Sequence, residues 1–312
     1  MRKLVWFVGL AGLLMAVNPG WAAAPHAPGQ GDAVVTILPK HGDERAINIE
    51  ARDLEVKVSG GLATVTGWTR LRGADGDLEV VVLIDDGSSP DLSNQFGDIA
   101  AFLNGLPPGT KAGVAYMQNG RAVLAGPLST NHAAVAAELR LPTGIIDASA
   151  SPYFCLSDLA RHWPSKDSAA RREVVMITNG VDEYGEWGDL QDPYVEASIH
   201  DSVKSGLVVY GIYWSARGGF GSGAGSFFGQ SLMGQVTDAT GGGSYWTGSN
   251  NPVSLKPFLK DISWRMENQY RLNFDAKSSG KAEVKPMTLH VGGPAAKVVA
   301  PQRVYVKDRS GE

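Results

Sequence analysis

Oxygen-bearing side chains are concentrated in one short stretch of the chain, where residues 85–89 read DDGSS. The stretch follows residues 78–84, LEVVVLI, an almost unbroken apolar run that is typical of a strand buried on both faces. Open α/β sheets place their ligands beyond the carboxyl ends of such strands. Carboxylate and hydroxyl oxygens suit a hard cation such as Mg²⁺. The same groups can instead hydrogen-bond the loop and cap the next helix, so Asp85 and Ser89 have both a metal-binding and a structural interpretation.

Three later motifs add to this pattern. Ser129-Thr130 follows a predicted hairpin, Asn179-Gly180 follows a second buried-strand run at residues 173–178, and a predicted helix ends with ATGG at residues 239–242. Together with DDGSS, these motifs resemble the von Willebrand factor type A domain, whose DxSxS sequence forms a metal-ion-dependent adhesion site. The resemblance is strongest to the bacterial exported VWFA-related family and extends over roughly residues 54–306.

This resemblance implies metal-site positions at Asp85, Ser89, Ser129 and Asn179, with Thr130 as the alternative to Ser129. Two positions depart from the family pattern, because Gly87 replaces the first Ser of DxSxS and Asn179 replaces the Asp of TDG. The loss of a hydroxyl and a carboxylate lowers the number and charge of the ligands and weakens Mg²⁺ binding. We therefore favour partner binding without a cation over binding that a cation completes.

Acidic and aromatic residues follow on the loop after residues 173–178. Five carboxylates lie there: Asp182, Glu183, Glu186, Asp189 and Asp192. They form either a cation-attracting or partner-docking surface, or solvated loop charge, which is the usual role of such runs. Tyr184 and Trp187 are the predicted partner-binding residues, because Tyr and Trp are enriched at interface hot spots. Trp214 fits either this surface or the core.

The wider pattern predicts an α/β fold. Helical spacing alternates with strand-like runs, and Asn119-Gly120 marks a tight hairpin. We expect a Rossmann-like von Willebrand A-type domain at residues 77–270, with a mostly parallel central sheet, one antiparallel edge hairpin and helices on both faces. Short β segments are expected to flank it at residues 34–76 and 271–312. The Gly-rich stretch at residues 218–229 is expected to be a mobile loop.

The first residues predict export. Arg2 and Lys3 precede an apolar run at residues 4–17, and small residues follow at 22–24. The run is shorter than the roughly 20 residues of a transmembrane helix. We expect a signal peptide at residues 1–24, cleaved after Ala22 or Ala24, then a flexible spacer at residues 25–33 and no membrane anchor. Cleavage removes two of the 28 basic residues and none of the 32 acidic ones, so the formal charge changes from −4 to −6.

Composition and missing motifs argue against other functions. The net acidic charge disfavours a nucleic-acid partner. The single cysteine, Cys155, lies in an apolar helical pattern and is predicted to be buried, and one cysteine cannot form an internal disulfide or a cysteine-based zinc site. The sequence has no nucleophile elbow, P-loop or paired-histidine motif.

The sequence therefore predicts an exported bacterial binding protein, periplasmic or secreted, that is not an enzyme and engages a protein partner through the metal-site face. Mg²⁺ is the one cofactor that the resemblance implies. A structural component of the cell envelope is the first alternative, and an uncharacterised hydrolase is the second.

Overall fold

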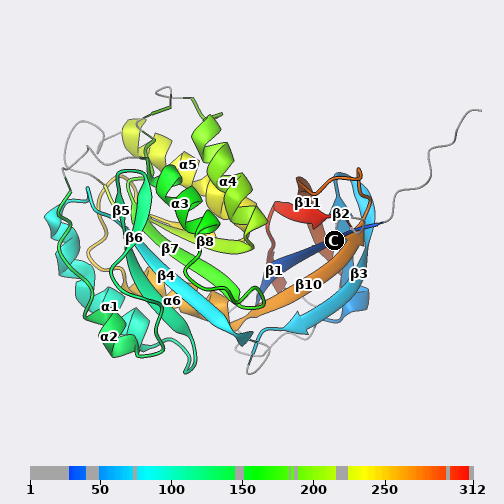
Figure 1. Ribbon diagram of the computed structural model, residues 1–312, viewed down its shortest axis with the longest axis horizontal. Helices are drawn as coiled ribbons and strands as arrows, with labels where there is room; N and C mark the ends of the chain where they lie inside the picture. Colours follow the sequence, from blue (N-terminus) through cyan, green and yellow to red (C-terminus); the bar gives the residue numbers. More distant parts are fainter. Residues whose placement is uncertain are drawn as a thin grey trace, which may run out of the picture.

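The computed structural model describes residues 28–39, 49–72, 76–144, 151–182, 184–185, 189–215, 224–292 and 296–308. The predicted signal peptide, the first residues of the predicted spacer, and Trp187 lie outside these ranges. The described chain forms two sheets, which lie side by side in Figure 1, with the α-helices packed around one of them. The first strand begins at Gly29, so residues 29–33 of the predicted spacer belong to a strand.

The six-stranded sheet carries the DDGSS loop. Its strands in spatial order are β6 (Arg121–Leu124), β5 (Lys111–Gln118), β4 (Leu78–Asp85), β7 (Arg171–Thr178), β8 (Leu207–Tyr213) and β9 (Gly243–Tyr245). Neighbouring strands from β5 to β9 pair in parallel, whereas β6 pairs antiparallel with β5. The predicted hairpin joins β5 to β6, and Asn119 and Gly120 both have the positive φ that a tight turn of this kind requires.

Helices cover both faces of this sheet. One face packs against α3 (Pro152–Arg161), α4 (Pro193–Lys204) and α5 (Ala224–Thr240). The other packs against α1 (Phe96–Asn104), α2 (His132–Ala136) and α6 (Lys256–Glu267), and the short helix η3 (Pro90–Gln95) joins β4 to α1. Every residue of β4 is buried as a result, which explains its continuous apolar sequence. No described helix combines the length and the apolar character that crossing a bilayer requires.

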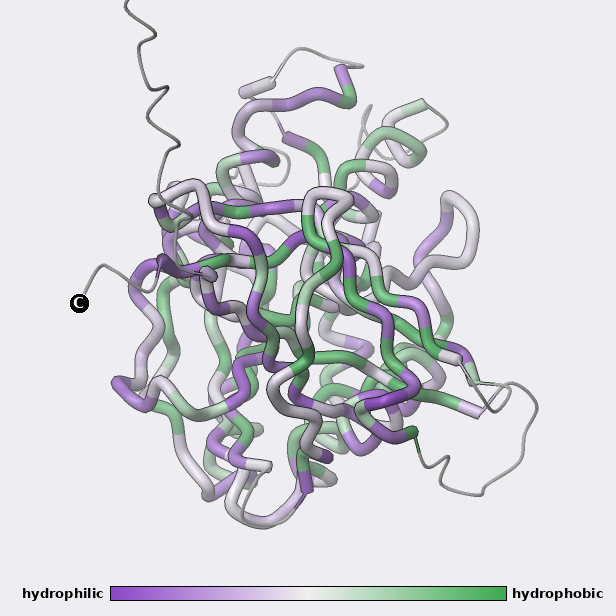
Figure 2. The backbone as a smooth tube through the Cα atoms, turned by 90° about the vertical axis from the view of Figure 1, so that its right-hand side faces the viewer, coloured by the Kyte–Doolittle hydropathy of each residue, from purple (hydrophilic) through white to green (hydrophobic). Residues whose placement is uncertain are grey.

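The second sheet is antiparallel and joins the two ends of the chain. It comprises β1 (Gly29–Pro39), β2 (Leu54–Val58), β3 (Gly61–Arg70), β10 (Gln269–Ala276), β11 (Glu283–Val291), β12 (Ala296–Val299) and β13 (Arg303–Lys307), with the short helix η1 (Ala51–Asp53) before β2. The strand order is β10-β3-β2-β11-β13-β1-β12, and an additional pairing of β10 with β1 closes the sheet. Its interior is a separate hydrophobic core, and Figure 2 shows hydrophobic segments alternating with hydrophilic ones along these strands.

The predicted fold class is therefore wrong for this molecule. We expected a mostly parallel central sheet with only short β segments beside it. The segments at residues 34–76 and 271–312 instead build a closed antiparallel sheet of seven strands, and the six-stranded sheet is mixed. The closure depends on pairing between residues far apart in the sequence, such as Val35 with Tyr270, and no local pattern shows such pairing.

The Gly-rich stretch also differs from its prediction. Its described part, from Ala224 onward, forms the first turns of α5 instead of a loop. Gly229 in α5 packs directly on the backbone of Asn179 and Gly180, and Tyr213 Oη donates a hydrogen bond of 2.8 Å to Ser226 Oγ. Small residues here allow the helix to approach the loop after β7, which compensates for their low helix propensity.

Candidate functional site

Asp85 is the last residue of β4, and its side chain bonds to the loop after β4 and to the end of β7 at the carboxyl edge of the six-stranded sheet. Its Oδ1 accepts a hydrogen bond of 2.9 Å from Gly87 N, and its Oδ2 accepts one of 2.8 Å from Thr178 Oγ1 at the end of β7. The side chain is buried. This geometry agrees with the structural interpretation of Asp85, because the carboxylate holds the turn that follows its own strand.

Ser89 does not make the hydrogen bonds that its structural interpretation predicts. It occupies the residue before η3, yet its side chain makes no capping hydrogen bond. The residue is fully buried, and its Oγ has no hydrogen-bond partner among the described residues. Ser89 is therefore a buried hydroxyl without a hydrogen bond to a described residue, and the predicted cap is absent.

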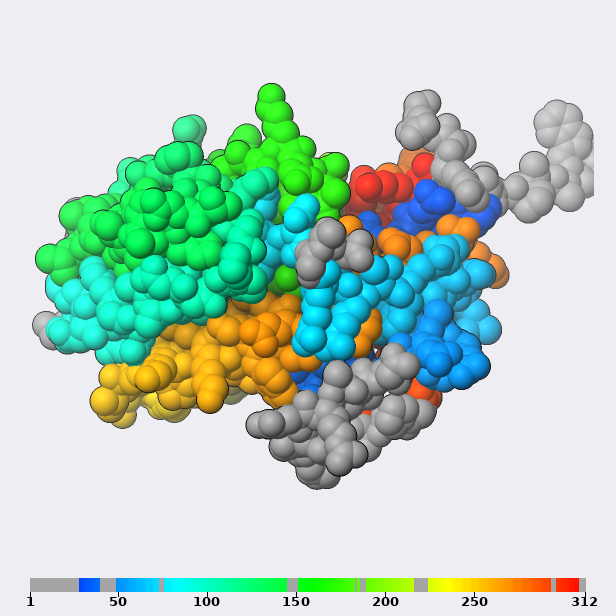
Figure 3. Space-filling model, turned by 90° about the horizontal axis from the view of Figure 1, so that it is seen from below, coloured from blue at the N-terminus to red at the C-terminus, as the bar shows by residue number. Residues whose placement is uncertain are grey.

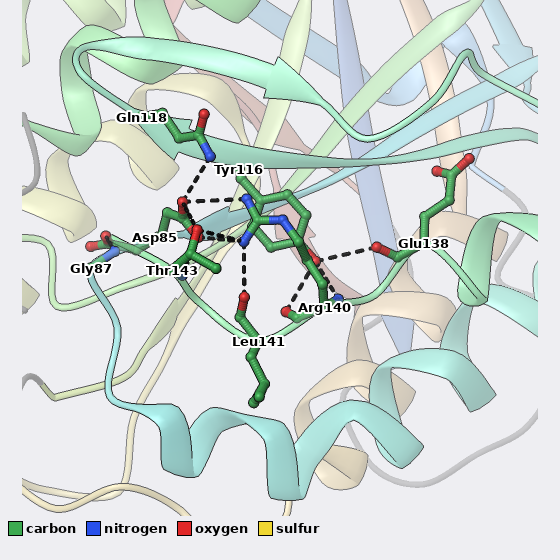
Figure 4. Close-up of polar contacts among 9 residues, drawn as sticks. Asp85, Gly87, Tyr116, Gln118, Glu138, Arg140, Leu141 and Thr143 are labelled. Carbon is green, nitrogen blue, oxygen red and sulfur yellow. Dashed lines mark hydrogen bonds and ion pairs between the residues drawn. The ribbon is translucent and has the colours of Figure 1, made fainter. Parts of the chain in front are cut away.

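Asp86 is the centre of a polar network at this edge, and Figure 4 labels three of its partners, Gln118, Arg140 and Thr143. Arg140 donates to both carboxylate oxygens, from Nη1 at 2.7 Å and from Nη2 at 3.3 Å. Gln118 Nε2 donates at 2.7 Å, and Thr143 donates from its backbone N at 3.0 Å and from Oγ1 at 3.2 Å. Asp86 is only 3% exposed. Asp86 therefore links the DDGSS loop to the end of β5 and to the segment at residues 140–143.

The charges of this network reinforce one another. Burial alone would raise the pKa of Asp86, but the hydrogen bonds from Arg140, Thr143 and Gln118 outweigh it, so the pKa lies below its usual value. The same contact raises the pKa of Arg140. The Arg140 guanidinium also lies 3.7 Å from the centre of the Tyr116 ring, a cation–π distance. Arg140 is thus held as a permanent, oriented cation at this edge.

Ser129 and Thr130 lie at the other edge of the sheet. Ser129 pairs with Ala112, which lies at the amino end of β5, in register with Val80 of β4. Asp85 is five residues beyond Val80 along the strand, a length of about 16 Å. Ser129 Oγ accepts a hydrogen bond from Asn131 N before α2. The predicted placement of Ser129 or Thr130 in one metal site with Asp85 is wrong, because the chain leaving the antiparallel strand β6 runs back to the amino edge.

Asn179 lies at the carboxyl edge, beside Thr178. Its Oδ1 accepts a hydrogen bond of 3.0 Å from Val181 N, and the following Gly180 has a φ of 69°. The side chain therefore stabilises a tight turn after β7. An amide cannot supply the negative charge that an Asp supplies to a metal at this position of the family pattern.

The residues present do not fit the metal site that the resemblance implies. Only Asp85, Ser89 and Asn179 share the carboxyl edge, and oxygens of Asp85 and Asn179 already accept hydrogen bonds from the chain. The adjacent carboxylate, Asp86, is paired with the Arg140 guanidinium. Among the described residues, no group of three or more His, Cys, Asp or Glu side chains is arranged to hold a metal ion.

Aromatic side chains gather beyond the end of β7. Phe154 of α3 contacts Tyr184, with ring centres 5.4 Å apart, and Tyr194 of α4, at 4.8 Å. Tyr184 is 61% exposed, and Leu190 and Leu141 are also exposed. We call Arg140, Leu141, Phe154, Tyr184, Leu190 and Tyr194 the carboxyl-edge surface. Trp214 is buried in the core.

The acidic loop is partly internal. Asp182 and Asp192 are both buried, and Asp192 Oδ1 caps α4 by accepting hydrogen bonds from Tyr194 N and Val195 N. Burial raises the pKa of Asp182, and the neighbouring Asp192 carboxylate adds to that rise, against the hydrogen bond from Tyr184 N. Asp189 is exposed, whereas Glu183 and Glu186 lie outside the described residues.

Cys155 is buried in α3, as its apolar pattern predicted. Burial raises the pKa of its thiol to about 12. The thiol is therefore protonated at neutral pH and is not a nucleophile.

The sequence interpretation missed Arg140 and Thr143, and it gave Thr178 no role beyond being part of the Thr178-Asn179-Gly180 motif. Thr178 directly precedes Asn179, so its position at the end of a buried strand was a usable signal. Arg140 and Thr143 lie in a stretch without helical or strand periodicity, and only the structure shows that this stretch returns to the carboxyl edge.

No protein-family model matches the chain. No curated protein matches it. Similar solved structures include an aerotolerance-related membrane protein from Bacteroides fragilis with multiple mutations to serines (16% identity, TM-score 0.45, 61% of this chain and 98% of that chain). They also include the conserved hypothetical protein BatB from Bacteroides thetaiotaomicron (15% identity, TM-score 0.43, 61% of this chain and 97% of that chain). A third is a von Willebrand factor type A protein from Catenulispora acidiphila (12% identity, TM-score 0.42, 94% of this chain and 77% of that chain). Identities and TM-scores this low say nothing about ligand, partner or activity.

The chain's own topology nevertheless places its motifs consistently. DDGSS follows β4, the Thr178-Asn179-Gly180 turn follows β7, and ATGG ends α5, where Gly242 packs against the Val209 carbonyl too closely for any side chain. The part of the chain that contains the six-stranded sheet has a von Willebrand factor type A-like fold.

Proposed function

We propose that this chain is an exported binding protein that engages a protein partner through the carboxyl-edge surface, without a bound divalent cation and without catalysing a reaction. The observation that carries the proposal is the aromatic cluster of Tyr184, Phe154 and Tyr194, in which both tyrosines are exposed, at the same sheet edge as the oriented Arg140. Tyr and Arg are the side chains most enriched, with Trp, among residues that dominate binding energy at protein interfaces.

The surface is held in place before any partner arrives. Tyr184 packs on Phe154 from α3, and Tyr184 N donates to Asp182. Arg140 is fixed by Asp86 and by the Tyr116 ring, while its side chain remains 37% exposed. Because these side chains are already ordered, a partner that binds them loses less conformational entropy than it would with mobile side chains.

The absence of a cation in the proposal rests on charge. In the family pattern a metal supplies the positive charge that attracts a partner's carboxylate. Here Arg140 supplies a positive charge at the same edge, and Asn179 provides no carboxylate for a metal. We therefore expect partner binding to survive EDTA.

Photo-crosslinking in the producing cells tests the proposal. A photoreactive residue replaces Tyr184 in the full chain, and the matched control carries it at Leu62, which is 69% exposed on β3 of the other sheet. We expect a discrete cross-linked protein from position 184, unchanged by EDTA, and none from position 62. With the purified partner, Tyr184→Ala should weaken binding about tenfold or more, whereas Leu62→Ala should leave it unchanged.

Three results would contradict this function: equal cross-linking from both positions, binding abolished by EDTA, or turnover of a substrate by the purified chain alone. Export is tested separately by the N-terminus of the protein recovered outside the cytoplasm. We expect it to begin at Ala23 or Pro25, and an intact Met1 would contradict export.

A further inference from the structure

A basic pocket lies between the two sheets, away from the carboxyl-edge surface. Its volume is about 380 Å³, and it is enclosed by the start of β7, the end of α4 and strands β1, β10 and β13. Arg172, in this pocket, pairs in register with Glu79 and Leu207 near the amino ends of β4 and β8. The pocket therefore lies at the amino edge of the six-stranded sheet. Figure 3 shows the green surface of this half meeting the red and blue surface of the closed sheet.

The lining is strongly cationic although the whole chain is acidic. Arg171, Arg172, Lys204, Arg271 and Lys307 line the pocket, and Asp32 is the single carboxylate among its lining residues. Arg171 is buried and neutralised by Glu173 behind it, with Nε 3.4 Å from Oε1. No described carboxylate forms a salt bridge with the other four cations. Four positive charges thus converge with one negative charge to balance them, an arrangement that an anion would stabilise.

The two arginines of this group are fixed and incompletely bonded. Arg172 Nη2 donates to Asp167 O at 2.9 Å, and Arg271 Nη2 donates to Ala169 O at 2.8 Å. The Nε atoms of both side chains are buried and have no acceptor among the described residues. Each guanidinium is therefore oriented by a backbone carbonyl and retains one buried N–H donor without an acceptor. A buried donor without an acceptor lowers the stability of the fold unless a ligand accepts from it.

We propose that this pocket binds a phosphate group, either free or carried by a small organic ester. A phosphate presents several oxygens at once and carries close to two negative charges at neutral pH, so it can accept from both arginine forks while the two lysines add point charge. The volume falls within the range of small-molecule pockets and leaves room for more than inorganic phosphate. Such a ligand would contact strands of both sheets and hold them together.

Calorimetric titration of the exported chain at constant ionic strength tests this proposal, with inorganic phosphate and glycerol 2-phosphate as separate probes and sodium chloride as the blank. We expect saturable binding of at least one probe and a rise in Tm with its concentration. Tighter binding of the ester than of phosphate would assign an organic ligand, and the reverse order would assign the free anion. Both results support the site.

Lys204→Gln and Lys307→Gln remove exposed charges at the pocket and should leave folding intact, because neither side chain has a partner among the described residues. Each should weaken phosphate binding about fivefold or more. Lys260→Gln, on the exposed face of α6 outside the pocket, is the matched control and should leave the affinity unchanged. The proposal is overturned by no saturable binding of either probe, or by equal weakening in the Lys260→Gln control.

Discussion

Asp86 illustrates how a single side chain organises the carboxyl edge. The family pattern gives it no ligand role, yet it accepts hydrogen bonds from Arg140, Gln118 and Thr143. We expect Asp86→Ala to lower the free energy of unfolding by about 1–3 kcal/mol, because it leaves these donors without their buried acceptor. Urea unfolding at pH 7 measures the change. Asp189→Ala, at an exposed loop position, is the control and should change stability little; an equal loss in both variants would contradict a special role for Asp86.

The raised pKa of Asp182 predicts that removal of this carboxylate stabilises the chain, whereas removal of the Asp86 carboxylate destabilises it. The folded chain holds a proton on Asp182 to higher pH than the unfolded chain does, because burial and Asp192 oppose its charge. Stability therefore falls as pH rises from the ordinary Asp value of about 3.9 through the raised folded pKa. Asp182→Asn removes the charge while an amide oxygen can still accept from Tyr184 N.

We expect the Asp182→Asn variant to be more stable than the unaltered chain at pH 7, with the difference disappearing near pH 3. Thermal unfolding across this pH range measures it, and Asp189→Asn provides the control. Parallel pH profiles for the variant and the unaltered chain would show that Asp182 has an ordinary pKa.

Residue chemistry alone could predict only part of the site. The oxygen-rich loop after residues 78–84 identified Asp85 at a strand's carboxyl end, and the structure places it there. Ser129 was misplaced because its position was inferred from motif order along the chain. Thr143, whose hydroxyl does reach the DDGSS loop, follows a stretch with no periodicity, so neither spacing nor pattern pointed to it.

At the scale of elements, strand direction carried information that the motif order did not. Asn119-Gly120 correctly predicts a tight hairpin, and a hairpin reverses the chain. The residues that follow β6 therefore begin at the amino edge of the six-stranded sheet, so Ser129 lies away from the DDGSS loop. The closed antiparallel sheet could not be foreseen in the same way, because its strands pair across nearly the whole length of the chain.

Helix α5 offers a test of how an element is docked. A Cβ at Gly229 would collide with the Asn179 carbonyl oxygen, whereas a Cβ at Gly234 in the same helix would meet no atom within 4 Å. We expect Gly229→Ala to destabilise the chain by about 1–3 kcal/mol and to disturb the turn after β7. Gly234→Ala should instead stabilise it by about 0.5–1 kcal/mol, since Ala is the better helix former.

Chemical unfolding of the two glycine variants measures both effects, and each serves as the control for the other. A Gly229→Ala chain as stable as the unaltered chain would show that α5 can move away from Asn179 without cost. Such freedom would also weaken the argument that the carboxyl-edge surface is ordered before a partner binds.

At the scale of the whole molecule, the buried side chain of Arg171 connects the two sheets. Arg171 is the first residue of β7, and its Nη1 donates to Met266 O at 2.7 Å and to the side chain of Gln269, the first residue of β10. Arg171 also forms a buried ion pair with Glu173. Gln269 in turn donates to Tyr210 Oη in β8 at 3.1 Å. The contact thus joins the start of a closed-sheet strand to the centre of the six-stranded sheet.

Removing one member of this pair should cost more than removing both. Arg171→Met leaves the Glu173 carboxylate buried without a cation, and we expect a loss of about 3–5 kcal/mol in the free energy of unfolding. Adding Glu173→Leu to that variant should recover part of the loss, because apolar replacement of a whole buried pair is often close to neutral. Denaturant unfolding of the single and double variants measures the coupling. If the double variant is as unstable as the sum of the single ones, the two charges do not stabilise each other, and the sheets are held together by packing of α4 against β13 and β11 instead.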